Sequence, residues 1–359
     1  MSTQVSVEGR KKILQAISEM NIGQVNLMEV CGTHTMAIAK SGLKSVLPSN
    51  IKLLSGPGCP VCVTPNEVLD AILALAMEKN VTIATYGDMI RVPGSRQGEN
   101  LAKCRAEGAS IEIVYSALDA VEIAKQDPKR EVVFLGAGFE TTAPGTAMAA
   151  KVAAEQNVRN FSVLSMLKRV EPALRALISD SEFNVQGFLC PGHVATIIGE
   201  EGFRFLTEEF HIPAVISGFE PEDILISVYK LAKQIKENNP HLENEYTRAV
   251  MPQGNQIALN VMDEMLEARD DLWRGLGMIP LSGYKLKPEY AAFDAEIKFG
   301  LDIKPSNTKS ACRCGDVIQG KIGPKDCPMF GKVCLPENPA GPCMVSSEGA
   351  CAAEYKYNS

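Results

Sequence analysis

The sequence lacks any run of 18 or more apolar residues, which is the length that a membrane-spanning helix requires. Its longest apolar helical stretch, near residues 68–77, is interrupted by Asp70. The first 20 residues also lack the apolar core of a secretory signal peptide. Their pattern predicts an amphipathic helix whose inward face carries Ile13, Leu14 and Ile17. We therefore expect a cytoplasmic protein with no membrane partner.

Positive charge is also scarce. The 359 residues include 36 Lys and Arg against 43 Asp and Glu, which gives a formal net charge of −7. Binding of phosphate groups requires a basic surface, so this balance disfavours nucleic acid and favours small molecules or other proteins as partners. The absence of a CxxxCxxC sequence argues against a radical SAM enzyme. The remaining composition, 45% apolar and 22% charged, is that of an ordinary globular protein with room for two or three domains.

Short apolar runs that are typical of buried strands alternate with segments of helical period over the first 235 or so residues. The predicted strands are residues 25–32, 51–58, 81–87, 110–115, 131–138, 161–167, 186–192 and 213–219. The predicted helices between and after them include residues 66–79, 117–126, 143–156 and 221–237. This alternation predicts an α/β fold with parallel, doubly wound sheets.

Eight strands are more than one compact sheet of this size usually holds, so we expect two α/β domains. We place their division near residues 126–130, which gives domains at 1–128 and 129–238. Residues 239–359 would form a third region, with a helix at 255–269, a stretch that wraps the first two domains, and a cysteine-rich iron-sulfur domain.

Six of the eleven cysteines lie in the last 48 residues of the chain, and we call residues 312–357 the tail. The tail cysteines are Cys312, Cys314, Cys327, Cys334, Cys343 and Cys351. The segments between them are rich in Gly, Pro and Lys, so the tail needs a metal or a crosslink to be ordered. The spacing differs from that of a paired CxxC zinc ribbon, and structural disulfides belong to oxidising compartments. A redox cluster is therefore favoured over structural zinc and over plain disulfides.

Further reactive residues follow the predicted strands, where ligands bind in doubly wound sheets. Cys31 and His34 follow the first strand, and Cys59 and Cys62 form a CxxC after the second. Glu140 and two threonines follow the fifth strand, and His193 follows the seventh. A CxxC just before a helix favours thiolates, which exchange disulfides or bind soft metals. Cys31 joins that pair if the first two strands are neighbours.

Structural roles remain open for several of these residues. Cys104 stands alone in a charged helical segment and is interpreted as a buried thiol, as Cys190 can be. His34 and His193 can serve as structural hydrogen-bonding groups, and the threonines after Glu140 can simply cap the next helix. His211 and His241 are expected at the surface. The Gly136-x-Gly138 segment lacks the third glycine of a dinucleotide site, which disfavours nucleotide binding there.

Taken together, these motifs resemble those of the HypD family of [NiFe]-hydrogenase maturation proteins. The resemblance spans nearly the whole chain, and no motif departs from the family pattern. The matching segments are CGTHT (31–35), GPGCPVC (56–62), GFETT (138–142), PGHV (191–194), and the tail from CRCGD (312–316) through DCP (326–328) to MVSSEGACAAEYKY (344–357).

The resemblance implies a scaffold that assembles the Fe(CN)2CO group of the hydrogenase, together with a HypC-like chaperone and a HypE-like cyanide donor. By motif position, Cys31, Cys59 and Cys62 would bind Fe(II) carrying CN and CO. The resemblance also implies a [4Fe-4S] cluster beside a redox disulfide, as in ferredoxin:thioredoxin reductase. Carried over by position, Cys314 and Cys343 would form the disulfide, and the cluster ligands would be Cys312, Cys327, Cys334 and Cys351.

The spacing alone does not select these four cysteines from the six. Two other interpretations stay open: a stand-alone cluster-dependent disulfide reductase, in which Cys59 and Cys62 accept electrons, and a zinc-binding adaptor without catalytic activity. The sequence contains no pattern that decides whether the chain turns over as an enzyme. It also contains no pattern that indicates the source of the CO, the order of ligand delivery, the oligomeric state or the partner surfaces.

Overall fold

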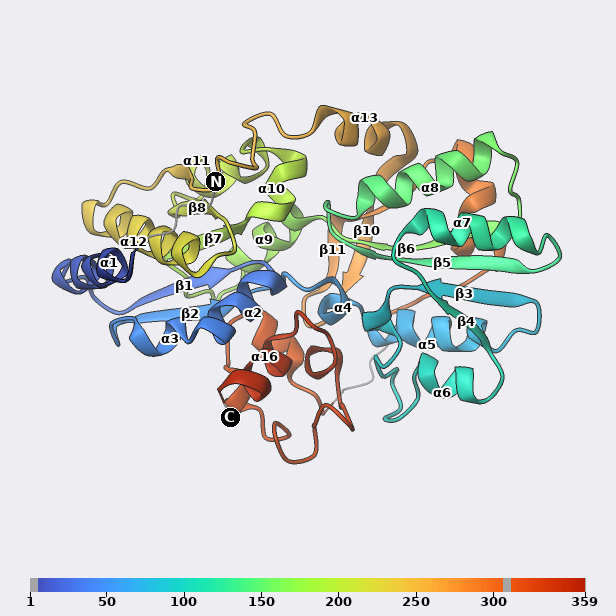
Figure 1. Ribbon diagram of the computed structural model, residues 1–359, viewed down its shortest axis with the longest axis horizontal. Coiled ribbons are helices and arrows are strands. Elements are labelled where there is room, and N and C mark those ends of the chain that lie inside the picture. The colour runs from blue at the N-terminus through green and yellow to red at the C-terminus, as the bar shows by residue number, and fades with distance from the viewer. Residues whose placement is uncertain (1–5, 306–310, 359) are drawn as a thin grey trace.

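The computed structural model of the protein describes residues 6–305 and 311–358, and it confirms an α/β fold with two parallel sheets (Figure 1). The first sheet has the strand order β2-β1-β7-β8-β9, and the second has the order β4-β3-β5-β6. The strands of the first sheet are β1 (Val25–Glu29), β2 (Ile51–Ser55), β7 (Gly187–Pro191), β8 (Ala214–Ser217) and β9 (Leu242–Asn244). Those of the second are β3 (Val81–Thr85), β4 (Ser110–Ile113), β5 (Glu131–Gly138) and β6 (Phe161–Leu167).

All eight predicted strands are present, and β9 is an additional short one. The central strands are continuously apolar because helices cover both faces of each sheet. Every residue of β3 and of β6 is buried, as is every residue of β5 after Glu131. This pattern distinguishes a parallel sheet inside an α/β protein from a sheet with one solvated face.

The division of the strands between the sheets differs from the division expected near residue 128. Val81 of β3 pairs with Glu131 of β5, so the second sheet crosses that boundary. Strand β7 returns to pair with β1, where Leu27 lies opposite Gly187. The first sheet is therefore assembled from two separated parts of the chain, and the contiguous ranges 1–128 and 129–238 do not separate the sheets. Periodicity identifies strands but does not state which of them pair.

The helices of the first sheet include the amphipathic N-terminal helix, whose predicted inward residue Ile17 is 2% exposed. Helix α1 packs on α12, and α2 continues into α3 through Gly42. The helices and 3-10 turns associated with this sheet are α1 (Val7–Glu19), α2 (Gly32–Ser41), α3 (Leu43–Val46), α10 (Gly192–Ile198), η2 (Glu201–Phe203), α11 (Arg204–Glu208) and α12 (Pro221–Glu237).

The remaining helices up to residue 178 lie along the second sheet or connect it to the first. They are α4 (Pro60–Val63), α5 (Asn66–Ala76), η1 (Gly87–Met89), α6 (Leu101–Ala106), α7 (Ala117–Gln126), α8 (Ala143–Glu155) and α9 (Val170–Ile178). None of the helices among the described residues is both long enough and apolar enough to cross a bilayer.

A β-hairpin replaces part of the helix that was expected at residues 255–269. Helix α13 (Gln256–Met265) ends at Met265, and the chain continues as β10 (Leu266–Trp273), which pairs antiparallel with β11 (Gly277–Leu286). The expectation of helix beyond Met265 was wrong because pairing with a distant strand overrides local helical period. Figure 1 shows the hairpin between the two sheets, followed by η3 (Pro288–Phe293) and α14 (Ala295–Lys298).

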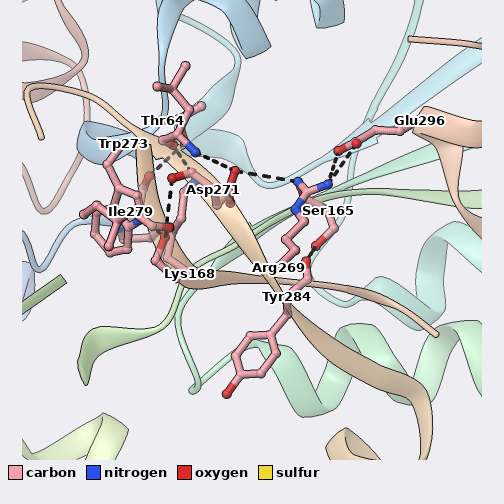
Figure 2. A network of polar contacts seen from close by, with 12 residues as sticks. Thr64, Ser165, Lys168, Arg269, Asp271, Trp273, Ile279, Tyr284 and Glu296 are labelled. Carbon is pink, nitrogen blue, oxygen red and sulfur yellow. Dashed lines mark hydrogen bonds and ion pairs between the residues drawn. The ribbon is translucent and has the colours of Figure 1, made fainter. Parts of the chain in front are cut away.

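A buried ion pair and a hydrogen bond from Arg269 attach the hairpin to the second sheet (Figure 2). The Lys168 ammonium, at the end of β6, donates to Oδ2 of Asp271 at 2.7 Å, and its side chain is only 2% exposed. The Arg269 guanidinium donates to Glu296 at 2.7 Å and to the carbonyl of Ser165 in β6 at 2.9 Å. The position of the hairpin on the sheet is therefore fixed by charge pairing as well as by backbone contact.

The tail folds into short helical pieces below and between the two sheets in Figure 1. These are α15 (Cys314–Ile318), η4 (Pro324–Asp326), η5 (Pro342–Met344) and α16 (Ala350–Tyr357). Helix α16 packs on α2, which begins directly after Cys31, so the tail reaches the end of strand β1.

The buried ion pair yields a stability prediction. In Asp271→Ala the Lys168 ammonium stays buried without its partner, so we expect the free energy of unfolding to fall by about 3–5 kcal/mol. Replacing both residues, in Lys168→Met/Asp271→Leu, should lower the free energy of unfolding by clearly less than Asp271→Ala does, because an apolar pair needs no charge compensation. Glu264→Ala, which breaks the partly exposed pair with Lys151, is the control and should cost less than about 1 kcal/mol. Urea denaturation measures all three, and equal losses in the single and double variants would contradict the argument.

Candidate functional site

Cys31 lies at the end of β1 and is the last residue before α2. It is 8% exposed, and its backbone N–H donates to Oε2 of Glu29 at 3.0 Å. Burial, reinforced by the carboxylate of Glu348, raises the pKa of the Cys31 thiol to about 12. Cys31 is therefore a protected, neutral thiol until a metal ion or another reaction partner removes its proton.

The GPGCPVC loop lies directly against Cys31, because β1 and β2 are neighbours as the sequence analysis required. The N–H of Gly32 donates to the carbonyl of Gly58 at 3.3 Å. A Cβ atom on Gly58 would lie 2.3 Å from the backbone nitrogen of Cys31, so only glycine allows this approach. The structure thus brings the first two cysteine motifs together.

Cys59 and Cys62 form a disulfide in this structure. Cys59 precedes α4, and both sulfurs are buried, with residue exposures of 5% and 1%. Because the two sulfurs are bonded to each other, they cannot bind a metal as thiolates before the disulfide is reduced. Across the described parts of the chain, no three His, Cys, Asp or Glu side chains surround a position where a single metal ion fits.

The tail contributes polar groups to this place that the sequence analysis did not single out. Oγ of Ser346 lies 3.3 Å from Sγ of Cys59. Glu348 accepts a hydrogen bond from the hydroxyl of Thr33 at 2.8 Å, beside Cys31. Asp88, after β3, accepts a hydrogen bond from the hydroxyl of Ser347 at 2.7 Å. Ser346, Ser347 and Glu348 could have been noticed only because they lie in the last tail motif, residues 344–357. Nothing in the sequence pointed to Asp88.

His34 and His193 are brought together by Phe219. The ring of Phe219 stacks with His34 at a centroid distance of 4.6 Å and with His193 at 3.8 Å. Nε2–H of His34 donates to the carbonyl of Gly218 at 2.8 Å, while the buried Nδ1 has no hydrogen-bond partner. Burial lowers the pKa of His34 to about 4, so this imidazole is neutral at physiological pH.

Glu140 lies at the second sheet, in the turn after β5, and is 3% exposed. Its Oε1 accepts the backbone N–H of Val170, at the start of α9, at 2.9 Å, and its Oε2 has no partner. Burial raises the pKa of Glu140 to about 7. Of the two threonines that follow, Thr142 precedes α8 without capping it through its side chain, and its hydroxyl donates back to the carbonyl of Phe139. The hydrogen bond of the Glu140 carboxyl is thus to the start of α9 rather than to a thiol.

The six tail cysteines line one small cavity. Every other residue around it is apolar: Val317, Met329, Phe330, Ala340, Gly341 and Met344. A [4Fe-4S] cluster takes one thiolate on each of four irons and is commonly enclosed by apolar side chains. The sulfur-only donor set and the apolar wall therefore fit such a cluster.

Cys314 is the centre of the thiol contacts within this cavity. The thiols of Cys312 and Cys343 donate to its sulfur, and together with the guanidinium of Arg274 they lower the pKa of Cys314 well below its usual value. The same contacts raise the pKa of Cys312 and of Cys343. Cys314 and Cys343, the pair expected to form a redox disulfide, are adjacent free thiols in this structure. Cys343 also contacts Cys351.

The disulfide-bearing helix α4 packs on both α15 and η5, the two tail elements that carry Cys314 and Cys343. Figure 1 shows α4 between the second sheet and the tail. The GPGCPVC loop that leads into α4 contacts Cys31. The arrangement can therefore support thiol–disulfide exchange between the tail and the CxxC, next to a third cysteine that stays reduced.

Comparison with known proteins agrees with the motifs. The family model of HypD, described as the hydrogenase formation hypA family, matches residues 8–358. The hydrogenase maturation factor HypD2 of Bradyrhizobium diazoefficiens is 44% identical over 337 residues, which cover 92% of this chain and 88% of that protein. The hydrogenase maturation factor HypD of Escherichia coli is 43% identical over 334 residues, covering 93% and 89% of the two chains.

The raised pKa of Glu140 yields a pH-dependent prediction. In the folded protein this carboxyl keeps its proton up to about pH 7, whereas in the unfolded chain it loses it near 4.5. Its contribution to stability is therefore complete below pH 4.5 and is lost as the pH rises to 7, by up to about 3 kcal/mol. Glu140→Gln cannot ionise, so its stability relative to the wild type should rise between pH 5 and 7.5. Urea denaturation across this range tests it. Glu171→Gln, at a partly exposed neighbouring position, is the control, and its free energy of unfolding should follow that of the wild type across the range. If the difference in free energy between Glu140→Gln and the wild type stays constant with pH, ionisation of Glu140 is not the cause.

Proposed function

This chain belongs to the HypD family of hydrogenase maturation factors, and we propose that it is the scaffold on which the Fe(CN)2CO group of [NiFe]-hydrogenase is assembled. The observation that carries the proposal is the packing of Cys31 against the GPGCPVC loop, with α4 in turn packed on the tail elements that carry Cys314 and Cys343. A low-spin Fe(II) ion that carries cyanide and CO prefers thiolate ligands. We assign Cys31, Cys59 and Cys62 as the thiolates that hold this iron, which is the substrate of the assembly.

Iron binding requires two changes from the state observed here. Cys31 must lose its proton, which a bound metal ion promotes because the thiolate is the ligand. The Cys59–Cys62 disulfide must be reduced to two thiols. A reductant next to α4 is therefore part of the proposal, and we assign this role to Cys314 and Cys343, which lie on two elements packed against α4.

The exchange step balances within the chain. The Cys314 thiolate attacks one sulfur of the Cys59–Cys62 bond and forms a mixed disulfide, and the Cys343 thiolate then displaces the acceptor sulfur. One disulfide breaks and one forms, so Cys59 and Cys62 become thiols while Cys314 and Cys343 become bonded. The Cys59–Cys62 disulfide and the unbonded Cys314 and Cys343 are consistent with the starting state of this step.

The donor pair must then be reduced again. We assign Cys312, Cys327, Cys334 and Cys351 as ligands of a [4Fe-4S] cluster, in agreement with the sulfur-lined cavity. When bound, such a cluster supplies single electrons from an external low-potential donor. His34 lies three residues after Cys31 on α2 and is neutral, and Phe219 stacks on both His34 and His193. We propose that the two histidines shape the iron site. A catalytic role of Glu140 remains a prediction.

We place the partners on the same side of the molecule. A HypC-like chaperone would dock near Cys31 and the loop at residues 56–62, and a HypE-like donor would deliver cyanide to the iron held there. The second candidate function is a stand-alone disulfide reductase, which the contact between α4 and the thiol-bearing tail elements also favours. Such an enzyme would reduce generic disulfides with turnover, whereas a scaffold acts only with its partners.

The iron assignment predicts a spectroscopic result. When the chain is co-purified without oxygen together with a HypC-like partner, infrared spectra should contain cyanide and CO stretching bands. In Cys31→Ala these bands should disappear, while the Mössbauer signal of a [4Fe-4S] cluster survives. Cys104→Ala removes a lone thiol on α6 and should retain both signals. Diatomic bands of wild-type intensity in Cys31→Ala would refute the assignment.

The exchange step predicts the behaviour of Cys314→Ser/Cys343→Ser. Without the donor pair, the Cys59–Cys62 disulfide should stay oxidised during anaerobic reduction by dithionite, and iron loading at Cys31 should fall at least tenfold. Alkylation of free thiols followed by peptide mass spectrometry reports the oxidation state, and infrared intensity reports loading. Cys104→Ser is the matched control. Full iron loading in the double variant would eliminate the exchange step from the mechanism.

A further inference from the structure

The turn between β10 and β11 holds the segment that follows the CxxC disulfide. The backbone N–H of Arg274 donates to the carbonyl of Val63 at 2.8 Å. Its guanidinium donates through Nε to the carbonyl of Thr64 at 2.9 Å and through Nη2 to Oδ1 of Asn66 at 2.7 Å. One residue of the hairpin thus makes three hydrogen bonds to residues 63–66, which begin directly after Cys62.

The same turn also holds the start of α15, which begins at Cys314. Gly275 has a φ of +79°, and a Cβ on it would lie 2.4 Å from Cα of Gly315, so the two backbones are in direct contact. The side chain of Gln319 donates to the carbonyl of Gly275 at 2.8 Å and to that of Gly315 at 3.0 Å. Arg274 and Cys314 also line the same surface cavity.

Arg274 therefore connects the two segments whose sulfurs must meet during exchange. Disulfide exchange requires the attacking sulfur to approach the acceptor bond in a defined direction, and a displacement of about 1 Å in such a reaction can cost about a hundredfold in rate. The planar guanidinium fork suits this task because its donors have fixed relative directions. A lysine ammonium carries the same charge but lacks that fork.

We propose that Arg274 is a positioning residue that holds the Cys59–Cys62 disulfide and Cys314 in the relative orientation needed for exchange. This inference rests on the exchange step proposed above and adds to it a residue outside every cysteine motif. It also gives the β10–β11 hairpin a function beyond wrapping the two sheets.

The test follows the appearance of Cys59 and Cys62 thiols in the full chain. The oxidised holoprotein is mixed anaerobically with dithionite, quenched in acid at set times, alkylated, and analysed by peptide mass spectrometry. Arg274→Gln removes the charge and the fork, and Arg274→Lys removes only the fork. Lys285→Gln is the control within the same hairpin, since it breaks a partly exposed pair with Glu267 away from the turn. Cys314→Ser/Cys343→Ser supplies the rate of direct reduction.

We expect Arg274→Gln and Arg274→Lys both to slow the tail-dependent reaction at least tenfold, with Lys285→Gln within twofold of the wild type. Reduction by dithiothreitol, which attacks the disulfide from solvent, should be as fast in all three variants as in the wild type. This result would distinguish a loss of positioning from a general loss of structure. Wild-type rates in Arg274→Gln, or full rescue by Arg274→Lys, would overturn the positioning role while leaving the exchange step intact. A wild type that reduces no faster than Cys314→Ser/Cys343→Ser would overturn the exchange step and the role of Arg274 together.

Discussion

The contact between Gly58 and Cys31 is the constraint on which the arrangement of the site depends. Parallel pairing of β1 with β2 brings the ends of both strands to the same edge of the first sheet. At that edge the backbone at Gly58 approaches the backbone of Cys31 closely, and any side chain at position 58 would collide with Cys31. The loop therefore lies flat against Cys31, and α4, which follows it, is directed toward the tail. Three cysteines and the tail become neighbours as a consequence of one missing side chain.

Burial then determines the chemical state of each group at this place. An ionised thiol or carboxyl loses its hydration when it is buried, so Cys31 keeps its proton at neutral pH, Glu140 loses its proton only near pH 7, and His34 stays uncharged. Cys314 differs because two thiols and a guanidinium donate to its sulfur. The nucleophile of the proposed exchange and the protected ligand of the proposed iron site are thus both cysteines, and they differ in the hydrogen-bond donors and charges that surround them.

Much of this could be predicted from the sequence, and the failures have physical causes. Short apolar runs, several of which end in glycine, identified all eight major strands, and the reactive residues do follow those strands. Pairing was not predictable, because β3 joins β5 rather than β1 through contacts that leave no periodic signal. The helix expected through residue 269 ended at Met265, since pairing with β11 outweighs local propensity. Arg274 was overlooked for the same reason: its partners are about 210 residues away in the chain.

The two sheets consequently have different tasks. The first sheet presents Cys31 and the CxxC loop, whereas the second sheet anchors the hairpin through the Lys168–Asp271 pair. Asp271 is only three residues from Arg274, so the buried charge pair leaves the turn little freedom to move relative to the second sheet. Since the turn contacts both residues 63–66 and the start of α15, the position of Cys314 relative to the disulfide is set by the second sheet. The two-sheet α/β layout thus brings α4, which follows Cys59 and contains Cys62, into contact with the two tail elements that carry Cys314 and Cys343.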